Sequence, residues 1–203
     1  MGIPSRHEPP NTQELRRNAE VFSIFEVAVW TEFFQRLNGF HRETALQFSL
    51  NITETHSEVR GLRIEVSEAI VVEVTSLPQV GRAWFGRRTP NVVAVQDFLI
   101  EGKQIHQSRR GIALQSLPRP WDQVAVFLKK YITCEGRYHT IYYSELPLLS
   151  HLRHRALLNI PFYLFNDLHQ MAGFVRKAKH PNSSLTHHGL LKLIILWALA
   201  QQN

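Results

Sequence analysis

The segment from Val59 to Phe85 constrains the fold more than any other part of the sequence. Apolar and charged residues alternate over 62–66, which predicts a half-buried strand. Ser67 then offers a good N-cap for a helix that carries apolar residues on one side. Pro78 ends that helix, because a proline disfavours the helical conformation of the residue before it. The segment therefore predicts a strand and a capped helix in direct succession.

Two further elements are predicted before this segment. Apolar residues recur at three- and four-residue spacing from Val21 to Leu37, the pattern of an amphipathic helix that Asn38-Gly39 would end. Alternation of apolar and polar residues over 48–52 predicts a strand that pairs with 62–66, with 54–61 as the connecting loop. The sequence therefore predicts a small β-hairpin near 47–66.

The second half of the chain is predicted to be mostly helical. A basic, turn-rich stretch at 82–90 is followed by a short helix at 91–101 and by loop to residue 120. A helix of about three turns begins at Trp121. Three more helical patterns occupy 144–157, 161–178 and 187–201, with Thr186 as the expected N-cap of the last. The fold class is therefore mainly α with a small β-hairpin, a minor α+β character.

One domain is expected to span residues 11–203, after a flexible N-terminal arm at 1–10. The chain of 203 residues is 44% hydrophobic, enough to bury one good core. Its single cysteine excludes a disulfide framework and indicates a reducing compartment. No secretory signal and no apolar run of membrane-spanning length stand out, so an intracellular protein is expected, nuclear or cytoplasmic.

Enzyme chemistry has no motif to carry it. His151 and His154 have metal-ligand spacing, but their surroundings are basic and no H-E-x-x-H motif exists. Cys134 is followed by Glu135 and His139, yet sequence neighbours rarely form a nucleophile–base pair, so a buried or half-buried structural thiol at a helix end is expected. Phosphate-binding glycine motifs are absent. We therefore expect no catalytic activity, no metal, no cofactor and no small-molecule substrate.

Charge is distributed unevenly along the chain. Residues 1–78 hold 7 Lys and Arg against 11 Asp and Glu, so this sub-region is acidic. Residues 79–138 hold 10 basic residues against 4 acidic ones, and residues 139–203 hold 6 against 2. The basic helical sub-region at 79–203 could meet nucleic acid, or the acidic sub-region at 11–78 of a second copy.

The basic residues of the 79–138 stretch are interleaved with Trp84, Phe85 and Trp121. Arginines near exposed aromatic rings can bind phosphates and stack on bases. Alternatively, Trp84 and Phe85 belong to the core, while the arginines form a solvated face or pair with the acidic sub-region. The candidate nucleic-acid-binding residues are Arg82, Arg87, Arg88, Arg109, Arg110, Arg119, Lys129 and Lys130.

Three stretches of the sequence together carry a family resemblance. They are the Val59–Phe85 segment, I-T-C-E-G-R-Y at 132–138 with the apolar runs at 146–164, and L-T-H-H-G-L-L-K-L-I at 185–194. In this pattern the chain resembles the plant transposon proteins that lie within or beside retrotransposons, over most of residues 20–200. The family's usual glycine before Leu-Pro is Ser76 here. The resemblance implies no catalytic residues.

Two functions remain open on these grounds. The first is a transposon-derived accessory or Gag-like protein that binds RNA or DNA without sequence preference. The second is a non-enzymatic module for protein interaction or self-association. In neither case is a membrane partner expected.

Overall fold

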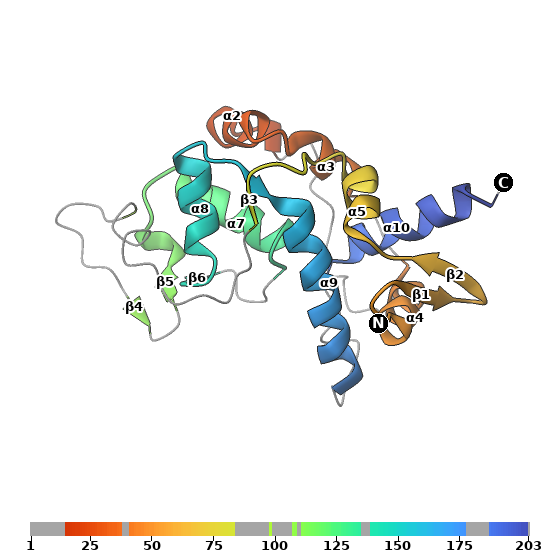
Figure 1. Ribbon diagram of the computed structural model, residues 1–203. Helices are drawn as coiled ribbons and strands as arrows, with labels where there is room; N and C mark the ends of the chain where they lie inside the picture. The colour runs from red at the N-terminus through yellow and green to blue at the C-terminus, as the bar shows by residue number, and fades with distance from the viewer. Residues whose placement is uncertain are drawn as a thin grey trace.

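The computed structural model describes residues 15–37, 41–83, 98, 107–108, 111–134, 139–177 and 187–202 (Figure 1). The expected arm at 1–10, nearly all of the expected helix at 91–101 and the expected cap Thr186 lie outside these ranges. Within them the fold is mainly helical with a minor β content, which confirms the predicted fold class.

The helices of the described ranges are α2 (Ala19–Val27), α3 (Thr31–Arg36), α4 (Arg42–Asn51), α5 (Glu68–Thr75), α7 (Trp121–Tyr131), α8 (Leu146–Arg153), α9 (Ile160–Lys177) and α10 (His188–Ala200), with the 3-10 turn η1 (Leu114–Ser116). The strands are β1 (His56–Val59), β2 (Leu62–Glu65), β3 (Arg82–Ala83), β4 (Gln107–Ser108), β5 (Gly111–Ala113), β6 (Thr140–Tyr142) and β7 (Leu158–Asn159). The helices α7, α8, α9 and α10 therefore lie where their periodicity predicts them.

Helix α9 runs through the middle of the molecule (Figure 1). On one side it packs against α4 and α5, which both contact α10, and α4 also contacts the β1–β2 hairpin. On the other side lie α8 and the short sheet β4–β5–β6, and α7 joins this group through α8 and η1. Buried apolar side chains from both sides form one core cluster. No helix within the described ranges is both long and apolar enough to cross a membrane.

The β-hairpin is present, but its first strand is not the predicted one. Strand β1 pairs antiparallel with β2 from His56 opposite Glu65 to Val59 opposite Leu62, around a turn in which Gly61 has a φ of 79°. Residues 48–52, predicted as a strand, belong to α4 and the residue that follows it. The prediction was wrong because the short alternation at 48–52 masks a helical spacing.

The helical spacing of α4 is set by three buried residues. Ala45, Phe48 and Ile52 lie three and four positions apart and are almost completely buried, whereas Leu50 is exposed. Residues at this spacing share one helix face, and that face packs against α9. The ring of His41 caps the helix by accepting a hydrogen bond from the Thr44 amide at 3.4 Å.

The helix predicted from Val21 to Leu37 is divided in two. Between α2 and α3 the backbone of Val29 turns to a positive φ of 61°. The break places Trp30 in the core, where its ring stacks on Phe25 at 5.9 Å between centroids. Phe34 meets Phe25 edge-to-face at 5.0 Å. The aromatic cluster offsets the cost of the break, since such pairs add to the gain from burial.

The Val59–Phe85 segment folds as predicted as far as its helix. The hydroxyl of Ser67 accepts a hydrogen bond from the Ile70 amide at 3.3 Å, so it caps α5. The helix ends at Ser76, whose φ of 55° is left-handed, two residues before Pro78. Strand β3 then pairs in parallel with β7, which joins residues 82–83 to the chain between α8 and α9.

Candidate nucleic-acid interface

Helices α7 and α8 lie side by side in opposite directions. Lys129, near the end of α7, contacts Glu145, which immediately precedes α8. At the opposite end, the buried ring of Phe98 meets Trp121 at 5.6 Å, and the guanidinium of Arg153 lies over the same ring at 5.2 Å from its centroid. The beginning of α7 and the end of α8 are therefore held together by one aromatic ring.

This end of the α7–α8 pair collects arginines from separate parts of the sequence. Arg119 lies two residues before α7, and its side chain is 82% exposed. Arg153 is the last residue of α8, and Arg155 follows it in a left-handed turn; both are exposed. The β3–β7 ladder then places the backbone of Arg82 opposite Leu158. We call Arg119, Arg153, Arg155 and the backbone position of Arg82 the arginine end.

Local electrostatics favour cations at part of this end. Arg153 lies in the last turn of α8, where the unpaired carbonyl groups carry partial negative charge. The carboxylate of Asp122, in the first turn of α7, lies 4.0 Å from Nε of Arg119. It also accepts a hydrogen bond from the Gln123 amide at 2.8 Å. A contact this long holds the exposed Arg119 side chain weakly, so its guanidinium remains available to an anion.

Lys129 must be removed from the predicted interface. Its side chain is fully buried, and its ammonium donates to both carboxylate oxygens of Glu145, at 2.9 and 3.2 Å. The ammonium also lies 4.3 Å from the ring centroid of Tyr142. A buried, paired ammonium cannot reach a phosphate on the surface. The Lys129-Lys130 doublet therefore does not act as one basic patch.

The other predicted residues fall into two groups. Lys130 is half-buried, with its ammonium 5.2 Å from the ring centroid of Tyr131 at the end of α7 away from the arginine end. Arg87, Arg88, Arg109 and Arg110 lie outside the described residues. The structure thus brings the backbone of Arg82 and the exposed side chain of Arg119 to one end of the helix pair.

Arg153 and Arg155 were not among the predicted residues. In the sequence they are the basic neighbours of His154, and their positive charge argues against a metal ion there. A signal was available, because Arg-His-Arg stands at the end of a predicted helix, where cations are favoured. What the sequence could not supply is their nearness to Arg119, which depends on the packing of α7 against α8.

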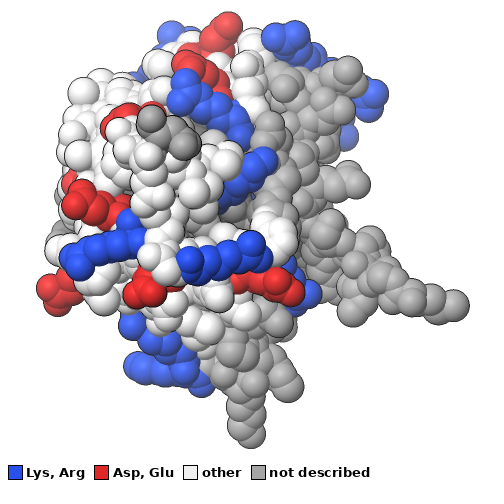
Figure 2. Space-filling view, turned by 90° about the vertical axis from the view of Figure 1, so that its right-hand side faces the viewer, with Lys and Arg blue, Asp and Glu red and all other residues white. Residues whose placement is uncertain are grey.

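The side of the molecule with α4, α5, α10 and the hairpin carries mixed charge. Figure 2 shows acidic and basic side chains interspersed on this face. Arg63 and Glu58, for example, are cross-strand partners in the hairpin. Opposite charges at such short spacing cancel each other's field, so this face would attract a polyanion weakly.

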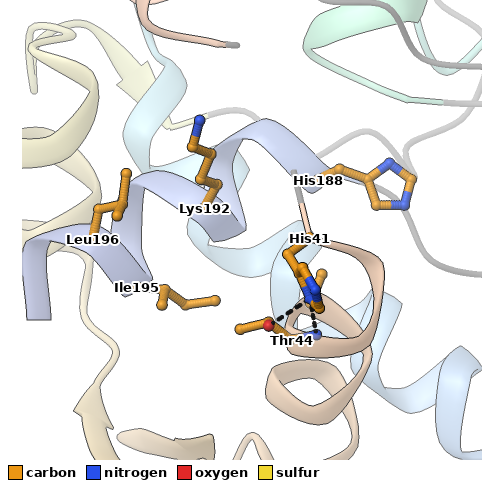
Figure 3. Close-up of a pocket in the computed structure, with 7 residues that line it drawn as sticks. His41, Thr44, His188, Lys192, Ile195 and Leu196 are labelled. Atoms are coloured by element: carbon orange, nitrogen blue, oxygen red, sulfur yellow. Dashed lines mark hydrogen bonds between the residues drawn. The ribbon is translucent and has the colours of Figure 1, made fainter. Parts of the chain in front are cut away.

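A pocket of about 320 Å³ lies between the beginning of α4 and α10 (Figure 3). Its walls are formed by His41, Thr44, Ala45, His188, Lys192, Ile195 and Leu196. The ring of His41 is engaged in capping α4, and it also hydrogen-bonds the Thr44 hydroxyl at 2.9 Å. Because α4 and α10 lie on the other side of the molecule from α8, the pocket is separate from the arginine end (Figure 1).

Neither a metal cluster nor a known relative bears on this interface. Among the described residues, no three His, Cys, Asp or Glu side chains are grouped so that they could hold a metal ion. No protein-family model, curated protein or solved structure matches the chain. Function is therefore inferred from the residues and their geometry alone.

Proposed function

We propose that this chain binds RNA or DNA without sequence preference through the arginine end. The observation that carries the proposal is the gathering of exposed arginines at one end of the α7–α8 pair: Arg119 precedes α7, Arg153 lies over the Phe98 ring, and Arg155 follows α8. These three residues come from two segments more than 30 positions apart, and all are exposed. A guanidinium presents a planar fork of donors that matches phosphate oxygens, so several on one end suit a nucleic-acid backbone.

The surrounding groups are consistent with contact to the backbone rather than to base edges. Trp121 is half-buried against Phe98, so part of its ring is available to stack on an unpaired base. Stacking tolerates any base, because every base has a π-face. The positive charge of the 79–138 stretch, 10 basic against 4 acidic residues, would add long-range attraction.

The biological context we propose is a transposon-derived accessory or Gag-like protein. The support for this context is the resemblance of Val59–Phe85, 132–138 and 185–194 to the plant transposon proteins. A protein of this kind would act by covering nucleic acid, which needs charge and stacking but no catalytic residues.

The test is a titration of labelled single-stranded RNA and duplex DNA at low and physiological salt. Affinity should fall linearly with the logarithm of salt concentration, because phosphate contacts release bound counterions. The double variant R119Q/R155N should flatten that slope by about two units, roughly one for each lost phosphate contact. Asparagine is chosen at 155 because it tolerates the left-handed backbone there.

The matched control is R42Q/R63Q, which removes the same charge. Both residues are exposed, one at the beginning of α4 and one on β2, on the side of mixed charge. This variant should keep nearly the full salt slope. Equal losses in the two variants would show that only net charge matters. Absence of binding below about 100 μM, the range of non-specific binders, would remove the proposal altogether.

The second candidate function, self-association, is favoured by an apolar strip on α10. Leu196 and Leu199 lie three positions apart on this helix and are 49% and 44% exposed. Residues at this spacing share one face, which a second copy could cover. Light scattering across a salt series would reveal oligomers, and the double variant L196E/L199E should dissociate them into monomers. A monomer at every salt concentration would exclude this function.

A further inference from the structure

Three reactive side chains from separate segments meet at the beginning of α10. Cys134, three residues after α7, places its sulfur 3.5 Å from Nδ1 of His187. The other ring nitrogen, Nε2, lies 2.6 Å from Oδ2 of Asp167 on α9. The order is thiol, imidazole and carboxylate, the arrangement of a nucleophile, its base and the group that orients the base.

The three side chains differ in burial: His187 is buried, whereas Cys134 and Asp167 are partly exposed. The side chain of His187 is 1% exposed, so its ring is shielded from water. Cys134 is half-buried, so this residue is less shielded from solvent than His187. The side chain of Asp167 is 25% exposed, and it is fixed to the ring by a short hydrogen bond. The imidazole therefore has a fixed orientation, with its partners at opposite edges.

The backbone at two of these positions is also unusual. Cys134 has a φ of 49° and His187 a φ of 52°, both in the left-handed region. That conformation costs of the order of 1–3 kcal/mol for a residue other than glycine, and such residues concentrate at functional sites. No hydrogen bond from the His187 side chain caps α10, so its ring serves the Cys134–Asp167 contacts instead.

The neighbours of His187 favour the charged form of its imidazole. Burial by itself lowers the pKa of His187, but the neighbouring Cys134 sulfur and the Asp167 carboxylate outweigh burial and raise the pKa to about 10. The ring is therefore positively charged at neutral pH. A positive imidazole beside the sulfur is placed to donate a proton to a leaving group.

A shared metal ion is an unsuitable explanation for this cluster. Cys134 and Asp167 contact opposite nitrogens of the His187 ring, so one ion cannot bind both and the ring together. His139, the histidine closest to Cys134 in sequence, is exposed, and its carbonyl accepts a bond from the Leu114 amide. The base beside the thiol is thus a residue more than 50 positions away.

We propose that Cys134 is a nucleophile that accepts an acyl group from activated esters or thioesters, with His187 as its acid–base partner and Asp167 as the positioning residue. This activity is independent of nucleic-acid binding, and it departs from our expectation that the chain is not an enzyme. It stands on the geometry of the three side chains and on the partial exposure of Cys134.

The reaction has two steps. In the first, the thiolate of Cys134 attacks the carbonyl carbon, a carbon–sulfur bond forms, and the bond to the leaving alcohol or thiol breaks as His187 supplies the leaving group's proton. In the second, water attacks the thioester carbon while His187 takes the water proton. The carbon–sulfur bond then breaks, which releases the carboxylic acid and returns Cys134 and His187 to their starting state.

The experiment uses p-nitrophenyl acetate as the acyl donor and the full chain as the protein. Cys134 is the only cysteine of the sequence, so an acetyl group bound to sulfur reports this site alone. The same chain in denaturant supplies the rate of an ordinary thiol. We expect the folded protein at pH 6.5 to be acetylated at least about tenfold faster than the denatured chain, since only the folded chain places the His187 ring beside the sulfur.

Three variants assign the roles. C134A should take up no acetyl group at this position, and H187Q and D167N should each lower the acetylation rate about tenfold or more. H139Q is the matched control and should react like the wild type. Because buried His187 contributes to the packing, H187Q could unfold; D167N, at a partly exposed position, then decides. Equal rates for the folded wild type, D167N and the denatured chain would overturn the proposal.

Discussion

Lys129 and Glu145 form an ion pair from which water is almost completely excluded. Their side chains are 0% and 3% exposed, and 2.9 Å separates the ammonium nitrogen from Oε2. The Thr133 hydroxyl donates to Oε1 at 2.5 Å, and the Tyr142 amide donates to Oε2 at 2.8 Å. Every oxygen of the carboxylate is therefore bound, which is the condition under which a buried pair can be tolerated. This ion pair joins α7 and α8 at one end, and the arginine end lies at the opposite end of the two helices.

Removal of one member of this pair should be costly. K129M leaves a buried carboxylate without its counter-ion, so we expect the free energy of unfolding to fall by about 3–5 kcal/mol. Urea denaturation followed by circular dichroism measures the change. The double variant K129M/E145M should be clearly more stable than the sum of the two single losses, because it buries no unpaired charge. Purely additive losses would show that the two side chains do not interact.

Gly81 allows strand β3 to lie close to the backbone that precedes β7. Its φ is 91°, and a Cβ at this position would lie 2.2 Å from the carbonyl oxygen of Leu157. G81A should therefore destabilise the protein by at least about 2 kcal/mol, from the left-handed backbone and the clash together. It should also weaken binding of nucleic acid, because β3 and β7 join the arginine end. Thermal denaturation and the RNA titration measure both effects.

Gly173 in α9 provides the control for that substitution. A Cβ there would meet nothing within 4 Å, and the position lies inside a regular helix. G173A should raise the free energy of unfolding by roughly 0.5–1 kcal/mol, since alanine loses less backbone entropy than glycine in a helix. A loss of stability in G173A as large as that in G81A would contradict this account of Gly81.

The cap of α5 gives a smaller and more local prediction. The Ser67 hydroxyl accepts a hydrogen bond from the Ile70 amide, which has no backbone partner in the first turn of the helix. S67A should lower the free energy of unfolding by about 1 kcal/mol, and S67D should retain most of the stability because aspartate is an equally good cap. The comparison of the two variants in urea separates loss of the cap from a general effect of mutation at this position.

Local signals in the sequence predicted those parts of the structure that depend on local chemistry. Ser67 before an apolar stripe identified α5, and the stripes after Trp121 identified α7 to α10. The strand at 48–52 was mispredicted because Phe48 and Ile52 satisfy both a two-residue and a four-residue spacing, and only packing against α9 decides. The break at Val29 likewise depends on what Trp30 gains in the core.

The sites depended on contacts over long distances in sequence, and there local reasoning was insufficient. Lys129 looked like half of a basic doublet until α8 placed Glu145 against it. Cys134 was weighed against its neighbour His139, whereas its partner in the structure is His187. No periodicity relates residues 134, 167 and 187, since three helices must pack before they meet.

The charge on His187 makes a prediction about alkaline stability. The contacts to Cys134 and Asp167 raise its pKa to about 10, whereas the imidazole of an unfolded chain titrates near 6.5. A group whose pKa is higher in the folded state stabilises that state fully below the unfolded value. This contribution is lost as the pH rises from about 6.5 through about 10.

The unfolding free energy of the wild type should therefore fall across this interval by an amount on the order of a few kcal/mol. The groups that face the ring are the Cys134 sulfur after α7 and the Asp167 carboxylate on α9. D167N should show a smaller fall, because the charged ring then lacks its carboxylate partner. Urea titrations at pH 6, 8 and 10 measure the slope. An identical dependence in wild type and D167N would mean that the imidazole does not carry the charge assigned to it.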